Sequence, residues 1–315
     1  MFKPIDSSSN QHRLVRTFSG HSDPVNACAI SPDGSFVVSG AGNVMKIYDQ
    51  PTDHTLKVWD FESGEELLTL AGHEEAIKAC AISRDGSLII SVGEDCTVVW
   101  DARTGENLNR LKPPGLACSA CTEDSTIVIA SFFVVLLDFQ TGDERSSILT
   151  DDILHDCAIS SDGSYIVTAG TDQHLVIWSA QDGEQIAALE SWDDIDPSGD
   201  VKACAISPDG SFMVSGGSDG FLRIWDTESM SEMRVFKGHR EDITACAISF
   251  DSCLLLSSSW DGTLKLWNPR TCEHLLTLEG HAGWVNGCVF SPCGKYVISA
   301  GDDMTVKVWD IADLR

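Results

Sequence analysis

One pattern of about 40 residues recurs along the chain and constrains its fold more than any other feature. Residues 201–236 show it most completely, as four short apolar runs, VKACAI, SFMVSGG, FLRIWD and EMRVF, separated by turn signals such as Pro-Asp-Gly and Ser-Asp-Gly. Such runs predict a four-stranded antiparallel sheet. Because a sheet with two apolar faces has no core of its own, it must stack against copies of itself.

Seven copies are marked by the end of the third run, where Trp or Leu precedes a polar residue. These endings lie about 37 to 47 residues apart, a spacing typical of four-stranded propeller blades. They are Trp59-Asp60, Trp100-Asp101, Leu137-Asp138, Trp178-Ser179, Trp225-Asp226, Trp267-Asn268 and Trp309-Asp310. A Gly-His pair opens four of the copies, at Gly20-His21, Gly72-His73, Gly238-His239 and Gly280-His281.

With both signatures in one register, residues 14–310 resemble the WD-repeat β-propeller family. The resemblance implies an all-β fold, a seven-bladed β-propeller of four-stranded antiparallel blades. We expect residues 13–315 to form this single domain and residues 1–12 to be a disordered tail. The repeats, built on ACAISPDGS, are also similar to those of propellers attached to nucleotide-dependent signalling proteins.

The two ends of the chain each hold part of one blade. Residues 13–18 (RLVRTF) match residues 273–278 (EHLLTL), which form the outermost run of an interior copy, whereas only IADLR follows Trp309-Asp310 in the last copy. We therefore expect the N-terminal strand to pair in the last blade, which closes the ring and removes its open edges. The family that the chain resembles closes its ring in the same way.

Several copies depart from the pattern. The first contains an insertion, and we assign residues 54–60 as its third strand and residues 43–52 as an inserted loop whose conformation the sequence does not predict. The third, fourth and fifth copies lack the Gly-His pair, and a longer loop, residues 191–200, precedes the fifth.

A His, a Ser, an Asp and a Trp recur at matching places in four copies, and in the family that the chain resembles such residues form one hydrogen-bonded network per blade. The sets are His21, Ser39, Asp53 and Trp59; His73, Ser91, Asp95 and Trp100; His239, Ser257, Asp261 and Trp267; and His281, Ser299, Asp303 and Trp309. Two copies lack the His and keep Thr168, Asp172 and Trp178, or Ser215, Asp219 and Trp225. Since a catalytic triad needs one exposed, activated hydroxyl beside an oxyanion hole, a set repeated in each blade favours a structural role.

Six of the 12 cysteines occupy one position of the first run, namely Cys28, Cys80, Cys157, Cys204, Cys246 and Cys288. We expect them to pack as small apolar side chains between blades. The other six are scattered, and we interpret Cys118 and Cys121 as packing residues of a strand. Zinc-ligand spacing and phosphate-binding loops are missing from the sequence, so we expect neither a metal nor a cofactor.

The formal net charge of −27 argues against nucleic acid and anionic membranes as partners. The N-terminus has no signal-peptide core, and the longest apolar run, residues 127–137, is too short to span a bilayer. Unpaired cysteines favour a reducing compartment. We therefore expect a cytoplasmic protein that is monomeric on its own.

Three tryptophans fall outside the repeat pattern, Trp192, Trp260 and Trp284, in loops that share one face of the disc in this family. Acidic residues surround them, namely Asp151, Asp152, Asp193, Asp194, Asp196, Asp200, Glu241 and Asp242. Aromatic anchors ringed by carboxylates suit a partner segment that bears Lys or Arg and an apolar side chain. Alternatively, the tryptophans pack between loops and the acids are merely solvated, and the sequence leaves both interpretations open.

Three functions remain. The leading one is a non-enzymatic protein-protein interaction scaffold or sensor module that binds a partner on this face. A second is the excised sensor propeller of a larger nucleotide-dependent signalling protein. The third is an enzyme with a site in the mouth of the central channel, for which His155 beside Asp156 is the sequence's one hint.

Overall fold

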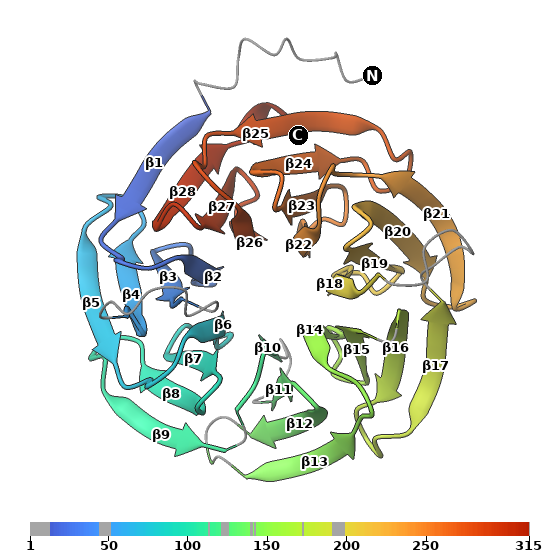
Figure 1. The fold of residues 1–315 in the computed structure, drawn as a ribbon, viewed down its shortest axis with the longest axis horizontal. Helices are drawn as coiled ribbons and strands as arrows, with labels where there is room; N and C mark the ends of the chain where they lie inside the picture. The colour runs from blue at the N-terminus through green and yellow to red at the C-terminus, as the bar shows by residue number, and fades with distance from the viewer. Residues whose placement is uncertain are drawn as a thin grey trace.

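The computed structural model describes residues 13–43, 52–112, 114–120, 126–138, 141, 143–171, 173–190 and 199–314. Within these residues, 28 strands form seven four-stranded antiparallel sheets around a central axis, which confirms the predicted propeller (Figure 1). The predicted tail, residues 1–12, and most of the predicted insertion, residues 43–52, lie outside the described ranges. None of the described residues belongs to a helix long and apolar enough to cross a membrane.

In blades 1 to 6 the strands run in chain order from the innermost to the outermost. Blade 1 contains β2 (Val25–Ile30), β3 (Phe36–Ala41), β4 (Thr55–Asp60) and β5 (Glu66–Ala71), and blade 2 contains β6 (Ile77–Ile82), β7 (Leu88–Gly93), β8 (Thr97–Asp101) and β9 (Asn107–Leu111). Blade 3 contains β10 (Ala117–Ala120), β11 (Thr126–Ala130), β12 (Phe133–Asp138) and β13 (Glu144–Leu149), and blade 4 contains β14 (Leu154–Ile159), β15 (Tyr165–Gly170), β16 (His174–Ser179) and β17 (Gln185–Glu190). Blade 5 contains β18 (Val201–Ile206), β19 (Phe212–Gly217), β20 (Phe221–Asp226) and β21 (Ser231–Lys237), and blade 6 contains β22 (Ile243–Ile248), β23 (Leu255–Ser259), β24 (Thr263–Trp267) and β25 (His274–Glu279).

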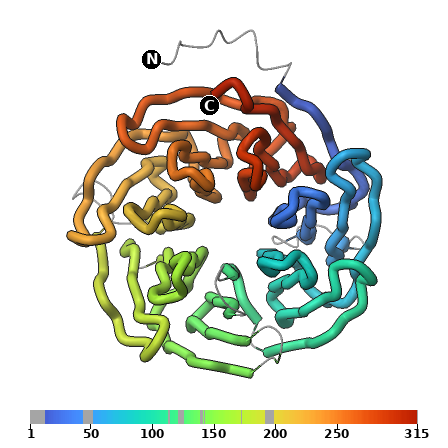
Figure 2. The backbone as a smooth tube through the Cα atoms, turned by 180° about the vertical axis from the view of Figure 1, so that it is seen from behind, coloured from blue at the N-terminus to red at the C-terminus, as the bar shows by residue number. Residues whose placement is uncertain are grey.

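Blade 7 joins the two ends of the chain, as predicted. Its inner strands are β26 (Val285–Phe290), β27 (Tyr296–Gly301) and β28 (Thr305–Asp310), and its outermost strand is the N-terminal β1 (Leu14–Ser19). β1 lies along β28 at the edge of blade 7 (Figure 2). The two strands are antiparallel, with Ser19 opposite Thr305 and Leu14 opposite Trp309. This pairing completes the ring.

Arg13 secures this closure by contacts with the C-terminal turn. Its guanidinium donates hydrogen bonds to the two carboxylate oxygens of Asp313 at 2.7 and 2.8 Å, and its backbone carbonyl accepts one from the N–H of Asp310 at 2.8 Å. The Asp313 contact holds the pKa of that carboxyl below its ordinary value. A charge-assisted, two-point contact of this kind fixes the position of the strand as well as holding it.

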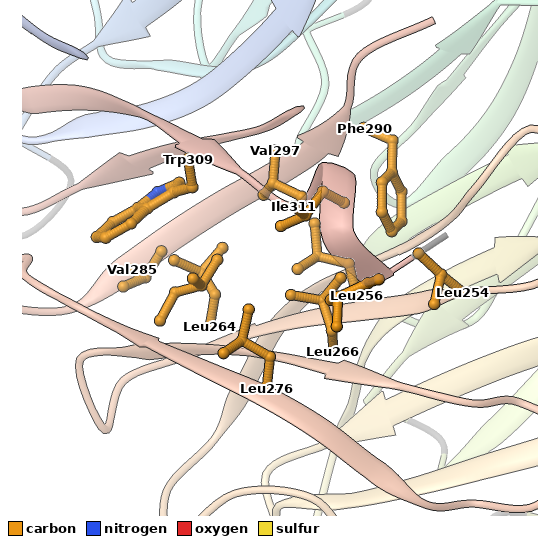
Figure 3. Packing of buried hydrophobic residues seen from close by; sticks show 12 residues of the cluster. Leu254, Leu256, Leu264, Leu266, Leu276, Val285, Phe290, Val297, Trp309 and Ile311 are labelled. Atoms are coloured by element: carbon orange, nitrogen blue, oxygen red, sulfur yellow. The ribbon is translucent and has the colours of Figure 1, made fainter. Parts of the chain in front are cut away.

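Apolar side chains fill every junction between neighbouring blades in the described part of the chain. At the junction of blades 6 and 7, Leu256, Leu264 and Leu276 lie against Val285 and Trp309 (Figure 3). Burying each such side chain contributes roughly 1.5 to 3 kcal/mol. Because both faces of each sheet are buried in this way, each blade depends on its two neighbours.

The innermost strands surround a central channel, and six of the described ones carry a β-bulge at their second residue. The bulged residues are all polar: Asn26, Lys78, His155, Lys202, Thr244 and Asn286. Three of them reach the next blade, since Asn26 donates to the carbonyl of Ile77 at 2.9 Å, Thr244 to that of Val285 at 2.6 Å, and Asn286 to that of Val25 at 3.1 Å. These bonds tie neighbouring blades together beside the channel.

The repeat cysteines contact the neighbouring blade. The Sγ atom of Cys157 lies 3.9 Å from the carbonyl oxygen of Val128, and that of Cys204 lies 3.7 Å from that of Val167. Burial raises the pKa of both thiols well above the ordinary value. The described cysteines are free thiols.

The interpretation of Cys118 as one of the scattered cysteines is wrong. In blade 3 it pairs with Ile129, at the register where Cys80 of blade 2 pairs with Ser91. The sequence hid this equivalence because blade 3 lacks the His, Ser and Trp that align the other copies. Cys121 lies outside the described residues.

The four His-Ser-Asp-Trp sets are hydrogen-bonded networks in blades 1, 2, 6 and 7. In blade 6, the Nδ1 atom of His239 lies 3.0 Å from Asp261 and its Nε2 atom 2.7 Å from the Oγ atom of Ser257, to which Trp267 donates at 3.0 Å. The same contacts in the other three blades measure 2.7 to 2.9 Å. The loop leading into each of these blades is thereby joined to its second and third strands.

The charge state of this network follows from burial and hydrogen bonding. Burial lowers the pKa of His239, so its imidazole is neutral at physiological pH. Burial alone would raise the pKa of Asp261, but hydrogen bonds from His239 and Thr263 outweigh it and hold that pKa well below the ordinary value. A neutral imidazole therefore donates to an ionised carboxylate.

Blades 4 and 5 contain shortened networks. Trp178 donates to Thr168 at 2.9 Å and Trp225 donates to Ser215 at 3.0 Å. Asp219 accepts from Arg223 at 3.0 Å instead of from a His, and Asp172 lies outside the described residues.

Comparing blades 5 and 6 tests the contribution of the His. We expect Ser257→Ala to lower the free energy of unfolding by about 2 to 4 kcal/mol, because it leaves both the Nε2 atom of His239 and the indole N–H of Trp267 buried without a partner. Ser215→Ala, which leaves only the indole of Trp225 without its partner, should cost about half as much. Urea denaturation of both variants measures the difference, and equal losses would contradict the role given to His239.

Removing residues 1–18 tests the closure. The deletion exposes the edge of β28 and removes the buried Phe18, so we expect aggregation or a melting temperature lower by about 10 °C or more. Val15→Ser, at an exposed position of the same strand, is the matched control and should melt within a few degrees of the native protein. A deletion variant that melts like the native protein would refute the closure.

Candidate partner-binding site

Two of the three tryptophans outside the repeat pattern meet at the junction of blades 6 and 7. Trp260 lies in the turn between β23 and β24, and Trp284 in the loop leading into β26. Their rings stack with centroids 4.7 Å apart and planes 22° apart, and Trp284 is 37% exposed. We call the face formed by these turns and leading loops the top face. Trp192, Asp193, Asp194 and Asp196 lie outside the described residues.

Lys202, which the sequence reasoning missed, contacts Trp260. Its Nζ atom lies 5.2 Å from the centroid of the Trp260 ring, 3.5 Å from Asp242 and 3.7 Å from Asp200. The predicted acid Asp242 therefore lies near Trp260, but it already forms an ion pair with Lys202. The sequence contains one signal for Lys202: the residue two places before the repeat cysteine is polar in six copies, and Lys202 is that residue in the fifth copy.

A cleft of about 640 Å³ adjoins the tryptophan pair. Its walls include Arg240, Lys265 and Glu279 as well as Trp260 and Trp284. Lys265 donates to the carbonyl of Gly238 at 2.7 Å. The cleft thus combines two stacked indoles with charges of both signs, a composition suited to a polypeptide segment.

The remaining predicted acids divide into two kinds. Asp151 and Glu241 are exposed on the top face. Asp152 accepts a hydrogen bond from Thr171, and Asp200 lies 3.3 Å from the Nε2 atom of His155 as well as near Lys202. Asp152, Asp200 and Asp242 therefore contact other residues of the chain, whereas Asp151 and Glu241 are exposed to solvent.

A second apolar feature of the top face, also missed in the sequence, lies between blades 3 and 4. Phe132, Leu149 and Ile153 are exposed large apolar side chains. Thr150 donates to the carbonyl of Phe132 at 2.9 Å, which brings the turn between β11 and β12 against the loop that follows β13. Phe132 occupies the same turn in blade 3 that Trp260 occupies in blade 6, and the Ser-Phe-Phe sequence was the signal for it.

His155 and Asp156, the hint of a catalytic pair, turn to different partners. His155 contacts Asp200, whereas Asp156 accepts hydrogen bonds from the backbone N–H groups of Cys157 at 2.8 Å and Cys204 at 2.9 Å. Asp156 lines the central channel, a cavity of about 470 Å³. The two neighbouring residues therefore do not form an acid-base pair with each other.

The match to known families covers six segments of the chain. Residues 12–60, 64–101, 146–179, 189–226, 230–268 and 272–310 match the family described as WD domain, G-beta repeat. These segments correspond to all blades except the third, whose network residues are missing.

Several known proteins are similar in sequence to parts of the chain. It is 26% identical to Apoptotic protease-activating factor 1 of Danio rerio over 182 residues, which are 54% of this chain and 14% of the relative. It is 34% identical to Pre-mRNA-processing factor 17 of Saccharomyces cerevisiae over 184 residues, 54% of this chain and 38% of the relative. It is also 34% identical to Nuclear distribution protein PAC1 of Arthroderma benhamiae over 94 residues, 30% of this chain and 20% of the relative. The chain thus covers well under two thirds of the length of each of these proteins.

Asp156 gives the protein a testable pH dependence. Burial raises its pKa to about 7, from 3.8 in an unfolded chain. Between these values the folded protein holds a proton that the unfolded chain has lost, so the contribution of Asp156 to stability falls as pH rises from about 4 to about 7. Asp156→Asn cannot ionise, and its single amide oxygen accepts from only one of the two N–H groups, because these donate to different oxygens of Asp156. Since the lost hydrogen bond costs stability at every pH, we expect the melting temperature of the variant, relative to that of the native protein, to be several degrees higher at pH 8 than at pH 4.5.

The control for this experiment is Asp151→Asn, which removes one carboxylate from an exposed position of the top face. Its melting temperature should follow that of the native protein across the same pH range. A constant difference between Asp156→Asn and the native protein at both pH values would contradict a buried, titrating carboxyl.

Proposed function

This chain belongs to the WD-repeat family, and from that membership we propose that it is a non-enzymatic interaction module that binds a partner protein beside Trp260 and Trp284. WD-repeat propellers generally serve as protein-interaction scaffolds. We further propose that the protein acts in the cytoplasm as a monomer, which the free thiols of its described cysteines support.

The observation that carries the proposal is the stacked pair next to a cleft. Trp284 is more than a third exposed, and its ring stacks on that of the half-buried Trp260. The pair therefore presents an aromatic surface to solvent. Stacking holds the exposed ring in one orientation before a partner arrives, which reduces the entropy that binding must overcome. Exposed tryptophans beside a pocket are frequent hot spots of protein interfaces.

The contacts of Lys202 support a partner segment that bears Lys or Arg. Within the chain itself, an ammonium group lies over Trp260 with Asp200 and Asp242 close by, so the surroundings of this indole suit a cation. We propose that a partner places an apolar side chain against Trp284 and a basic side chain toward Glu241. The net charge of −27 increases the rate at which such a basic segment associates.

A second candidate function has its own support. The similarity to Danio rerio Apoptotic protease-activating factor 1 extends over just over half of this chain but only 14% of that protein. We propose as the alternative that the propeller is the sensor part of a larger protein. An antibody against the propeller tests this on native extract: a band much larger than a 315-residue chain supports the alternative, and a band of that size opposes it.

Replacing the aromatic pair tests the leading proposal. Once a partner has been purified, we expect Trp284→Ala and Trp260→Ala to weaken its binding by roughly thirtyfold or more, since truncating a hot-spot residue costs about 2 kcal/mol or more. Isothermal titration calorimetry measures the loss. Raising the salt concentration should weaken binding to the native protein further.

Phe250→Ala is the matched control, because Phe250 is an aromatic residue of the same blade, 79% exposed, in the turn between β22 and β23 at the opposite end of the strands. It should bind the partner with native affinity. Full retention of binding by both tryptophan variants would exclude this site.

A further inference from the structure

The network of blade 2 differs from the other three in one residue. In blades 1, 6 and 7 a Thr follows two places after the network Asp, and its hydroxyl donates to that Asp at 2.6 Å. In blade 2 the turn is one residue shorter, and Cys96 takes the register position of Thr263 in blade 6. A thiol therefore enters a site that already contains an imidazole and a carboxylate.

The ligand atoms of this site lie close together. The Nδ1 atom of His73 is 2.8 Å from the Oδ1 atom of Asp95, and the Sγ atom of Cys96 is 3.3 Å from Oδ2 of Asp95 and 3.9 Å from Nδ1 of His73. Among the described residues, this is the one group of three His, Cys, Asp or Glu side chains whose ligand atoms all lie within 4.8 Å of one another. Tetrahedral zinc with ordinary bond lengths needs N, O and S ligands about 3.3 to 3.6 Å apart. The Nδ1–Oδ1 distance must therefore lengthen by about half an ångström and the Nδ1–Sγ distance shorten by about a third of one.

The protons of blade 2 can rearrange to free the ligand atom of His73. A metal at Nδ1 requires the imidazole proton to be on Nε2, which lies 2.7 Å from the Oγ atom of Ser91. The Ser91 hydroxyl must then donate elsewhere, and the carbonyl oxygen of Val98 is 3.5 Å away. In blade 4, which has no network His, Thr168 uses the equivalent carbonyl of Val176 at 3.5 Å. Within the described residues, Ser39, Ser257 and Ser299 make no such contact.

We propose that His73, Asp95 and Cys96 form a zinc-binding site specific to blade 2. Imidazole, carboxylate and thiolate are the three side-chain groups that bind Zn²⁺. The imidazole proton moves from Nδ1 to Nε2, and the Cys96 thiol proton leaves to solvent, so one proton is released for each ion bound. The backbone N–H of Glu74 donates to Oδ2 of Asp95 at 3.0 Å and continues to orient the carboxylate.

Arg110 is the group that opposes a cation here. Its guanidinium lies 3.0 Å from Oδ2 of Asp95 and 3.7 Å from the carboxylate of Glu74. The Arg110 side chain is 43% exposed, so it can turn into solvent when an ion enters. Water can complete the coordination, as it does in zinc sites that have three protein ligands.

Cobalt titration of the purified protein tests the proposal, because Co²⁺ substitutes for Zn²⁺ and gives an absorption band when a thiolate binds it. We expect one equivalent of Co²⁺ to produce this band, Zn²⁺ to displace it, and Zn²⁺ to raise the melting temperature by several degrees. Cys96→Thr restores the residue of blades 1, 6 and 7, so it preserves a network that those blades fold with. This variant should lose the band and the thermal shift.

Cys293→Ser, which removes an exposed thiol in blade 7, is the control and should keep both signals. His73→Gln should weaken Co²⁺ binding at least tenfold in the fraction that folds. The proposal is overturned if the native protein shows no thiolate band with one equivalent of Co²⁺, or if Cys96→Thr retains that band.

Discussion

Every blade of this protein depends on burying both faces of a sheet that has no core of its own. The buried side chains form clusters that lie between blades, such as that of Leu256 and Leu264 against Val285 and Trp309. Polar contacts are added at the two edges of this apolar layer. Near the channel, Asn26, Thr244 and Asn286 donate to carbonyls of the next blade, and on the top face the His-Ser-Asp-Trp networks fix the loops that lead into four blades. The apolar side chains hold the ring together, and the polar networks fix the positions of the loops that lead into blades 1, 2, 6 and 7.

The fold could be predicted from the sequence because its signals are periodic. Trp59, Trp100 and their counterparts set the number of blades, and the match of residues 13–18 to residues 273–278 predicted which strand completes the last one. The equivalence of Cys118 to the other repeat cysteines escaped because blade 3 lacks the residues that anchor the register. Periodicity identifies a position only where enough of its neighbours repeat as well.

The candidate site was less predictable for the same reason. Trp260 and Trp284 could be singled out because they do not repeat, but their stacking depends on the distance between loops of two different blades, which no local pattern encodes. Lys202 was not predicted because a polar residue recurs at its position in six copies. Nothing in that recurrence indicates that Lys202 lies beside Trp260 and forms an ion pair with Asp242. The sequence shows Cys96, but only the strand pairing shows that it occupies the position of Thr263 in blade 6.

The pairing of β1 with β28 also sets an order of events during synthesis. Among the described strands of the propeller, β1 is made first and its partner β28 last. Blades 1 to 6 are complete within continuous stretches of chain and can assemble as they emerge, while β1 stays unpaired beside them. Until β28 is made, therefore, the growing propeller is an open arc with an unpaired strand edge, the kind of edge at which β-proteins aggregate.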